Sequence, residues 1–325
     1  MKKRIGIFIL TYDRLDNIKR LLNRLNLYTN KNQKIFIFAD NAKKRSIKVK
    51  NVHNFLKTKR SNKFRIIIRK NHLGLKENCF QAYDFMFSIF DKVIYLEDDI
   101  LIKKNFLQFM KKNLFLYENN KKVMSITGYS FPFKLPDNYK HDIFFSKRAT
   151  SWSQASWRRV WKLFKRNKEN SLDILLDKKK LKKLLTLGED FLPMLVQSQL
   201  GKIDSFQIWW NWNIAKNNGI CINPTKPLVE NMGFNSSGTH FKKKIIFNNP
   251  EFHYQNNLKN NYKSDLLLKK NINYKKSYRV NFDKSIDYKF VKQFRISLKQ
   301  KLFYMYLPLK LVIIILTSLN FFIKK

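Results

Sequence analysis

The stretch Val93-Ile-Tyr-Leu-Glu97-Asp98-Asp99-Ile100 places three adjacent carboxylates at the end of a short apolar run. Such a run, bounded by polar residues, predicts a buried β-strand over residues 92–96. Because three neighbouring negative charges repel each other, the cluster needs a compensating positive charge. A hard divalent cation, Mg²⁺ or Mn²⁺, binds carboxylate oxygens and supplies that charge. Asp98 and Asp99 are therefore candidate metal ligands, and the plain alternative is a solvated acidic loop.

Apolar runs alternate with helical spacing on both sides of this strand. The other predicted strands are residues 5–10, 34–39, 64–69 and 123–127, and the predicted helices lie near residues 15–25, 47–56, 75–90 and 106–117. This alternation predicts an α/β fold, with a mostly parallel sheet flanked by helices. Ligands of such sheets bind beyond the carboxyl ends of the strands. We therefore expect the polar residues that end the strands to converge on one crevice, namely Thr11, Asp13, Arg14, Asp40, Glu97, Asp98 and Asp99.

The composition of the 325-residue chain allows a full core and indicates an anionic partner. Apolar residues make up 44% and aromatic residues 15%, which excludes a wholly disordered chain. Lys and Arg number 66 against 23 Asp and Glu, a net charge of +43. A chain this basic favours nucleic acid, an anionic membrane surface or a phosphorylated ligand. Two cysteines, Cys79 and Cys221, cannot build a disulfide framework, which favours a reducing compartment.

The organisation of the chain changes twice along its length. The alternation of strands and helices fades after about residue 150, and Lys and Asn dominate from about residue 242. We therefore predict a main domain over residues 1–241, a basic extension over 242–301 and a hydrophobic segment over 302–325. Pro308 and Lys310 interrupt the last segment, and a spanning helix needs about 20 continuous apolar residues. It is more typical of a helix lying in a membrane interface; the alternative is a helix packed on the protein's own core.

Four motifs in order resemble the nucleotide-sugar transferases of GT-A fold, and in particular their N-acetylglucosaminyltransferase I-like branch with its bacterial relatives. The first part is Ile5-Gly-Ile-Phe-Ile-Leu-Thr-Tyr-Asp-Arg14, followed by Asp40 and the acidic triplet. The Trp-rich stretch Arg148–Trp161 resembles the acceptor side of that group. Lys202–Phe206, Pro224 and Asn231–His240 resemble its catalytic and lid region. The likeness spans about residues 4–240, with a nucleotide-sugar-binding half over 1–100 and an acceptor half over 101–241.

The resemblance implies roles for the matching residues. Asp13 and Arg14 would contact the nucleotide, and Asp40 would read the uracil or ribose. Asp99 would bind the metal directly, with Glu97 and Asp98 close to the sugar and ribose. The loop from Ser237 to His240 would close over the donor and contact it. One departure is that Asn78 stands where the animal enzyme has a donor-contacting His.

The reaction that the resemblance implies needs a base to take a proton from the acceptor hydroxyl. The resemblance places Asp204 in that role, and Asp190 is the alternative in the Glu189-Asp190 pair. A single base without a nucleophile implies inversion at the anomeric carbon. Trp152 and Trp157 are candidates for stacking on an acceptor sugar, although most tryptophans of such clusters lie in the core.

Taken together, these patterns predict a metal-dependent inverting glycosyltransferase that uses a UDP-sugar. A glycan or lipid-linked glycan of a bacterial surface polysaccharide or lipooligosaccharide would be its acceptor. With no signal peptide or anchor expected in residues 1–10, we expect it on the cytoplasmic face of the inner membrane, against an anionic membrane surface. Two alternatives stay open. One is a basic nucleic-acid-binding protein, although no nucleic acid is expected, and the other is a sugar nucleotidyltransferase, although Thr11–Arg14 lacks the glycine that a triphosphate loop needs.

Overall fold

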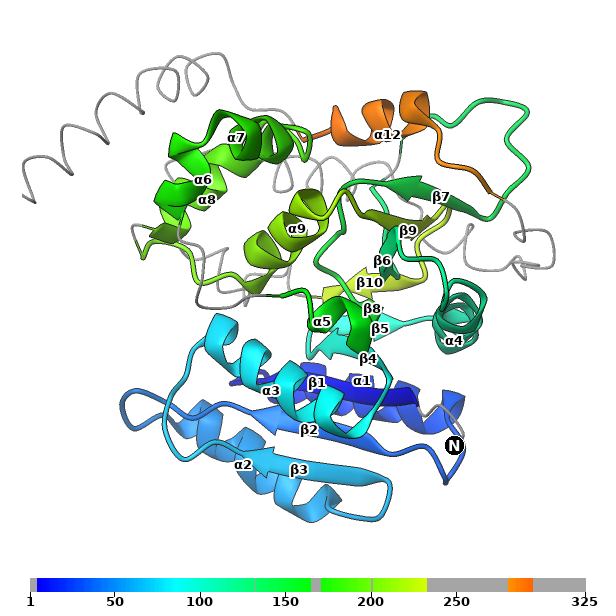
Figure 1. Cartoon of the computed structure of the whole chain (residues 1–325). Helices are drawn as coiled ribbons and strands as arrows, with labels where there is room; N and C mark the ends of the chain where they lie inside the picture. Colours follow the sequence, from blue (N-terminus) through cyan, green and yellow to red (C-terminus); the bar gives the residue numbers. More distant parts are fainter. Residues whose placement is uncertain (1–4, 132, 165–170, 200, 233–279, 295–325) are drawn as a thin grey trace, which may run out of the picture.

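The computed structural model describes residues 5–131, 133–164, 171–199, 201–232 and 280–294 (Figure 1). Its centre is an eight-stranded sheet in the order β3-β2-β1-β4-β8-β6-β9-β7. The strands of this sheet are β1 (Ile5–Thr11), β2 (Ile35–Ala39), β3 (Phe64–Ile68), β4 (Lys92–Glu97), β6 (Val123–Thr127), β7 (Ile143–Ser146), β8 (Gln154–Trp157) and β9 (Ile220–Pro224). The four strands of the first half pair in parallel, whereas β8 pairs antiparallel with both β4 and β6. The predicted α/β class, with a mostly parallel sheet flanked by helices, is confirmed.

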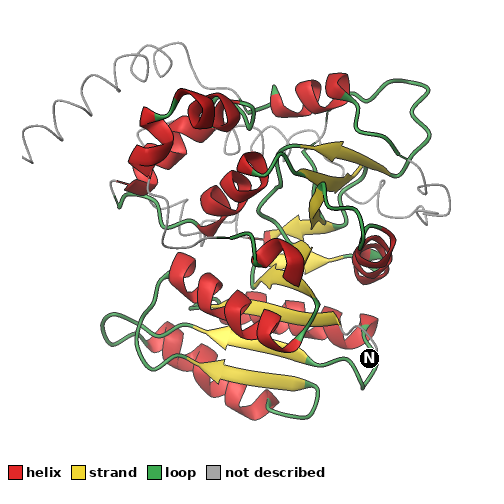
Figure 2. Ribbon diagram, viewed as in Figure 1, coloured by secondary structure: helices red, strands yellow, loops and turns green. Residues whose placement is uncertain are grey.

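Helices cover both faces of the parallel half (Figure 2). These are α1 (Leu15–Tyr28), α2 (Ile47–Lys59) and α3 (Leu75–Ile89). The crossovers through α1 and α2 run in one direction along the sheet and the crossover through α3 runs back. Since such crossovers are right-handed, α3 lies on the face opposite to α1 and α2. Because both faces are covered, β1 is apolar without alternation: Ile7, Phe8 and Ile9 are each 0% exposed.

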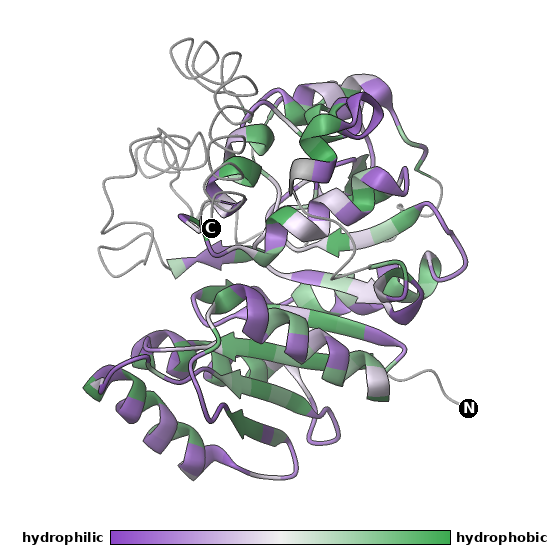
Figure 3. Cartoon of the chain, turned by 60° about the vertical axis from the view of Figure 1, so that its left-hand side comes forward, coloured by the Kyte–Doolittle hydropathy of each residue, from purple (hydrophilic) through white to green (hydrophobic). Residues whose placement is uncertain are grey.

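The second half of the chain adds a helical layer beside the antiparallel strands. Its helices are α4 (Phe106–Leu116), α5 (Arg158–Trp161), α6 (Ser171–Leu176), α7 (Lys178–Leu185), α8 (Phe191–Gln199) and α9 (Phe206–Lys216). A two-stranded sheet pairs β5 (Ile100–Ile102) with β10 (Val229–Asn231), which brings residues 229–231 beside the end of β4. Figure 3 shows hydrophobic strands in the parallel half, while the helices carry bands of both kinds.

Part of the predicted basic extension packs onto the main domain. Helix α12 (Lys284–Val291) lies against β7, where the rings of Phe290 and Phe144 are 5.1 Å apart. Phe290 is 0% exposed. Residues 242–279 and 295–325 lie outside the described residues, and the predicted interfacial helix falls within the second of these ranges. In the described ranges, none of the helices has the length and hydrophobicity of a transmembrane span.

Candidate functional site

The acidic triplet lies at the carboxyl end of β4, beside the end of β1. The parallel register pairs Leu10 with Glu97, so the turns that follow the two strands face each other. Thr11 Oγ1 donates a hydrogen bond of 2.7 Å to Asp98 Oδ2, and the Tyr12 N–H donates to the same oxygen at 3.3 Å. Asp98 and Asp99 are only 6% and 7% exposed. The alternative of a solvated acidic loop is therefore excluded.

Arg14 is the counter-ion that the fold brings to these carboxylates. Its Nη1 lies 2.5 Å from Asp99 Oδ2 and 3.4 Å from Asp98 Oδ1. Burial lowers the pKa of Arg14, but Asp98 and the other two carboxylates outweigh burial and raise that pKa. Asp13, in the same turn, is partly buried. Among the described residues of the site, the Arg14 guanidinium thus lies near three carboxyl groups, Glu97, Asp98 and Asp99, and acidic groups are in excess.

Two carboxyl groups of the acidic triplet, Glu97 and Asp98, have raised pKa values. Burial and the neighbouring Asp99 raise the pKa of Glu97 to about 8, while Arg14 and a 3.1 Å hydrogen bond from the Tyr95 hydroxyl act in the opposite direction. Burial also raises the pKa of Asp98 to about 6, against the lowering effect of Arg14. A further positive charge at this point would bring both pKa values down.

The donor atoms fit a hard cation in their chemistry and in their number. Carboxylate oxygens of Asp98 and Asp99 converge in a buried place that already needs positive charge. Among the described residues, no group of three or more His, Cys, Asp or Glu side chains is arranged to hold a metal ion by itself. Mg²⁺ and its relatives are commonly held by one or two carboxylates, with water and substrate phosphate completing the shell. Asp98 and Asp99 would hold such an ion and would share their oxygens with Arg14.

Asp40, at the end of β2, organises the loop that leads from β3 into α3. Its Oδ1 accepts hydrogen bonds of 2.9 Å from the N–H groups of Asn41 and Leu73. Its Oδ2 accepts a 2.9 Å bond from the Gly74 N–H and lies 3.1 Å from His72 Nδ1. Asp40 is 4% exposed. Both oxygens therefore shape the protein's own backbone, and its contact with a uracil or ribose stays a prediction.

Asn78 lies in the first turn of α3, and Arg69 fixes its orientation. The Arg69 Nε–H donates a 2.9 Å hydrogen bond to Asn78 Oδ1, and the Arg69 guanidinium stacks 5.1 Å from the centre of the Phe38 ring. Arg69, His72 and Gly74 are not among the site residues predicted from the sequence. A glycine that follows a polar turn and precedes a helix was the signal that could have drawn attention to this loop.

Asp204 lies at the amino end of α3, although it belongs to the link between α8 and α9. Both of its carboxylate oxygens are 3.3 Å from the Lys76 backbone nitrogen. This is a favourable place for a carboxylate, because the amino end of a helix carries partial positive charge. Asp204 is exposed, so the aromatic residues that follow it in the sequence do not bury it. Burial raises the pKa of the Cys79 thiol, and the charges of Glu97 and Asp204 add to that effect.

Asp190, the alternative base, is engaged in a buried ion pair. Its two oxygens accept bonds of 2.6 Å and 2.8 Å from Arg148 Nη1 and Nη2. Both residues are 3% exposed. A carboxylate held in this way is not placed to take a proton from a sugar. The ion pair therefore argues against a catalytic Asp190 and leaves Asp204 as the stronger prediction.

The two candidate acceptor tryptophans have different surroundings. Trp157 is 2% exposed, donates its Nε1–H to the Leu114 carbonyl oxygen at 2.9 Å and packs under Arg159. The prediction that Trp157 stacks on a sugar is therefore wrong, because β8 places it in the core. Trp152 is partly buried against Tyr129, with ring centres 4.1 Å apart. It stays a candidate.

The predicted lid residues Ser237 and His240 lie outside the described residues. The chain approaches the site just before them. The Met232 N–H donates a 2.7 Å hydrogen bond to the Asp99 carbonyl oxygen. The described structure thus brings together Thr11, Asp13, Arg14, Glu97, Asp98 and Asp99 at the carboxyl ends of β1 and β4, with Asp40, Asn78 and Asp204 around the start of α3.

Comparison with known proteins gives similarity to solved structures only. No protein-family model matches the chain, and no curated protein sequence is similar to it. Mannosyltransferase PcManGT from Pyrobaculum calidifontis, in complex with GDP-Man and Mn²⁺, is 12% identical with a TM-score of 0.36 over 49% of this chain and 46% of that one. S. aureus TarS 1-349 in complex with UDP-GlcNAc is 11% identical with a TM-score of 0.44 over 77% and 63%. GalNAc-T7 with UDP, GalNAc and Mn²⁺ is 10% identical with a TM-score of 0.44 over 68% and 42%.

The chain spans between about two-fifths and three-fifths of the length of the first solved structures that it matches. With TM-scores of 0.36 to 0.44, these similarities carry no activity, substrate or metal over to this protein.

Proposed function

We propose that this chain is a metal-dependent inverting glycosyltransferase of GT-A fold, which moves a sugar from a UDP-sugar to a hydroxyl group of a glycan. The observation that carries the proposal is the convergence of Asp98 and Asp99 with Thr11 and Arg14 at the carboxyl ends of β1 and β4. This is where an α/β sheet binds its ligands. Its buried acidic groups and the Arg14 guanidinium suit a cation and a diphosphate.

The residues of this site divide the work of transfer. A divalent cation, when bound, neutralises the negative charge that develops on the departing diphosphate. Thr11 and the Tyr12 N–H hold the Asp98 carboxylate in place. Arg14 binds Asp98 and Asp99, and it can donate to a phosphate oxygen in place of part of these contacts when the donor binds. Asp204 is exposed at the amino end of α3 and takes the proton from the acceptor hydroxyl.

Two variants test these assignments. Asp99→Asn removes a metal ligand and should abolish metal-dependent turnover of the donor. Asp204→Asn should retain donor binding and lose transfer. Retained transfer in Asp204→Asn would remove the base from this position. Screening nucleotide sugars for Mn²⁺-dependent thermal stabilisation identifies the donor, because a ligand that binds only the folded state raises the melting temperature.

The finer assignments are parts of the same proposal. The N-acetylglucosaminyltransferase I-like branch, a lipid-linked acceptor for a bacterial surface glycan and a place on the cytoplasmic face of the inner membrane rest on the motifs and on the apolar run 302–323. Fractionation of cells that produce the full chain, and of cells that produce residues 1–301, tests the membrane assignment. If the full chain and residues 1–301 were found in the membrane fraction in equal amounts, the segment 302–325 would have no role in membrane association.

A further inference from the structure

Helix α7 has a buried apolar side and an exposed basic side. Leu184 is 0% exposed, and Leu181 packs with it in a small core that α6, α8 and α9 share. On the opposite side Lys178, Lys179 and Lys182 are exposed. Two exposed leucines lie at the ends of this basic side: Leu176 precedes the helix and is 71% exposed, and Leu185 closes it and is 49% exposed.

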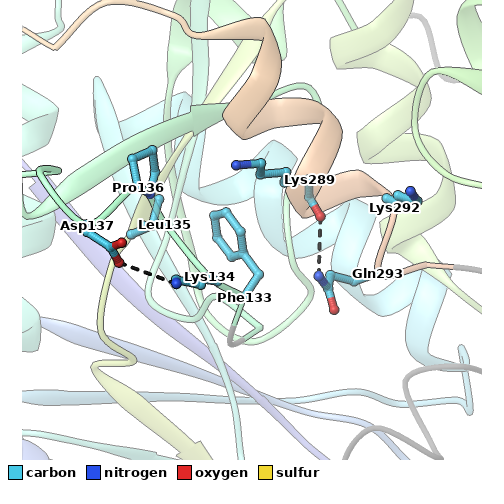
Figure 4. A pocket seen from close by; sticks show the side chains of 8 residues that line it. All are labelled: Phe133, Lys134, Leu135, Pro136, Asp137, Lys289, Lys292 and Gln293. Carbon is cyan, nitrogen blue, oxygen red and sulfur yellow. Dashed lines mark hydrogen bonds and ion pairs between the residues drawn. The ribbon is translucent and has the colours of Figure 1, made fainter.

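Helix α12 carries a second basic surface at the same end of the molecule (Figure 1). Its exposed side includes Lys289 and Tyr288, and Tyr288 is 63% exposed. A groove of about 750 Å³ separates α12 from the loop 133–137. Figure 4 shows Phe133 within this groove, with Lys134 on one side of it and Lys289 and Lys292 on the other.

Buried contacts join the segments that follow the two helices. The Glu189 N–H, just after α7, donates a 3.0 Å bond to the carbonyl oxygen of Phe294, just after α12. The Arg148 guanidinium that binds Asp190 also lies 3.5 Å from the centre of the Phe294 ring. These contacts place α7 and α12 side by side at this end of the molecule. We call these exposed residues the basic end, and it comprises Lys134, Leu176, Lys178, Lys179, Lys182, Leu185, Tyr288, Lys289 and Lys292.

We propose that the basic end docks on an anionic phospholipid surface. Exposed leucines and a tyrosine beside lysines are typical of protein surfaces that lie in a bilayer interface. There the apolar side chains enter the headgroup region and the lysines bind lipid phosphates. The acids at the starts of both helices are already used, because Asp177 and Asp283 accept hydrogen bonds from the backbone as caps. The described chain ends at Phe294, close to Lys292 of this surface, and the 31 residues that follow in the sequence contain the apolar run 302–323. The proposal does not depend on the chemistry of the donor site.

Vesicle binding by the full-length protein tests the proposal. One variant replaces three lysines of α7 (K178Q, K179Q, K182Q), and its control replaces three exposed lysines of α2 at the far end of the molecule (K48Q, K50Q, K57Q). Both variants lose the same charge, so a difference between them reports the surface and not the total charge. At low salt we expect the α7 variant to bind phosphatidylserine-containing vesicles about 100-fold more weakly, from the usual contribution of a lysine near an anionic leaflet. The α2 variant should change binding less than about threefold.

A second pair of variants separates insertion of apolar groups from attraction between charges. Leu176→Ser with Leu185→Ser should weaken vesicle binding at high salt too, whereas Leu27→Ser, which changes the 73% exposed Leu27 of α1, should not. Circular dichroism and Mn²⁺–UDP binding should be unchanged in all four variants, which keeps this test apart from that of the donor site. Equal losses in the α7 and α2 variants would overturn the proposal. The proposal would also be overturned if the α7 variant bound vesicles as the unchanged protein does but lost binding of a single-stranded oligonucleotide. That result would assign the surface to nucleic acid.

Discussion

Replacement of Asp190 by Asn separates a structural from a catalytic role for this residue. The change leaves Arg148 as a charge that is 3% exposed, in place of a pair with bonds of 2.6 Å and 2.8 Å. Removing one partner of a buried ion pair costs about 3–5 kcal/mol. We therefore expect the free energy of unfolding of D190N to fall by about that amount.

Urea unfolding followed by circular dichroism measures this loss. The matched control is D137N, because Asp137 pairs with Lys134 at 3.5 Å with side chains that are 90% and 84% exposed. Exposed pairs contribute about 0–1 kcal/mol, so D137N should unfold almost as the unchanged protein does. Below its unfolding transition, D190N should still transfer sugar. A D190N protein of full stability that cannot transfer sugar would refute this reasoning and make Asp190 the base.

Three further predictions concern the site and its surroundings. In EDTA the free energy of unfolding should fall as pH rises from about 5 to 8, because burial raises the pKa of Glu97 from 4.5 to about 8. Over this range the folded state keeps a proton that the unfolded state releases. Urea unfolding at several pH values measures this slope, which E97Q should flatten. Gly74→Ala should cost about 1–3 kcal/mol in the same assay, because Gly74 has φ +80° and an added Cβ would lie 2.6 Å from Asp204 Oδ2; Gly201→Ala, also at positive φ (+66°), is a comparison in which the added Cβ meets no atom within 4 Å. Trp152→Ala should raise the KM for the acceptor and leave the KM for the donor unchanged, whereas an equal rise in both would contradict an acceptor role.

The parallel half of the fold could be predicted from the sequence because its signals are local. Apolar runs such as Ile5–Leu10 mark strands that are buried on both faces, and the polar residues after them mark the ligand edge of the sheet. The meeting of Thr11 with Asp98 followed from the same reasoning, since both residues end neighbouring strands.

The contacts that could not be predicted join residues that are distant in the sequence. Arg14 is the counter-ion of Asp99 only because β1 and β4 are adjacent and in register. Asp190, just before α8, meets Arg148, just after β7, and no local pattern distinguishes a paired aspartate from a free one. Trp157 lies in a Trp-rich stretch that suggested sugar stacking, but the antiparallel pairing of β8 with β4 places its side chain in the core.

Calorimetric titration of UDP into the protein, with and without Mn²⁺, tests the central claim most directly. Two variants complete the experiment: D99N at the carboxyl end of β4, and D91N, whose 45% exposed side chain lies just before the amino end of the same strand. We predict that UDP binds the unchanged protein and D91N only when Mn²⁺ is present, and that D99N loses this binding at least tenfold. Binding of UDP that is equally strong without the metal, or equally strong in D99N, would contradict the account.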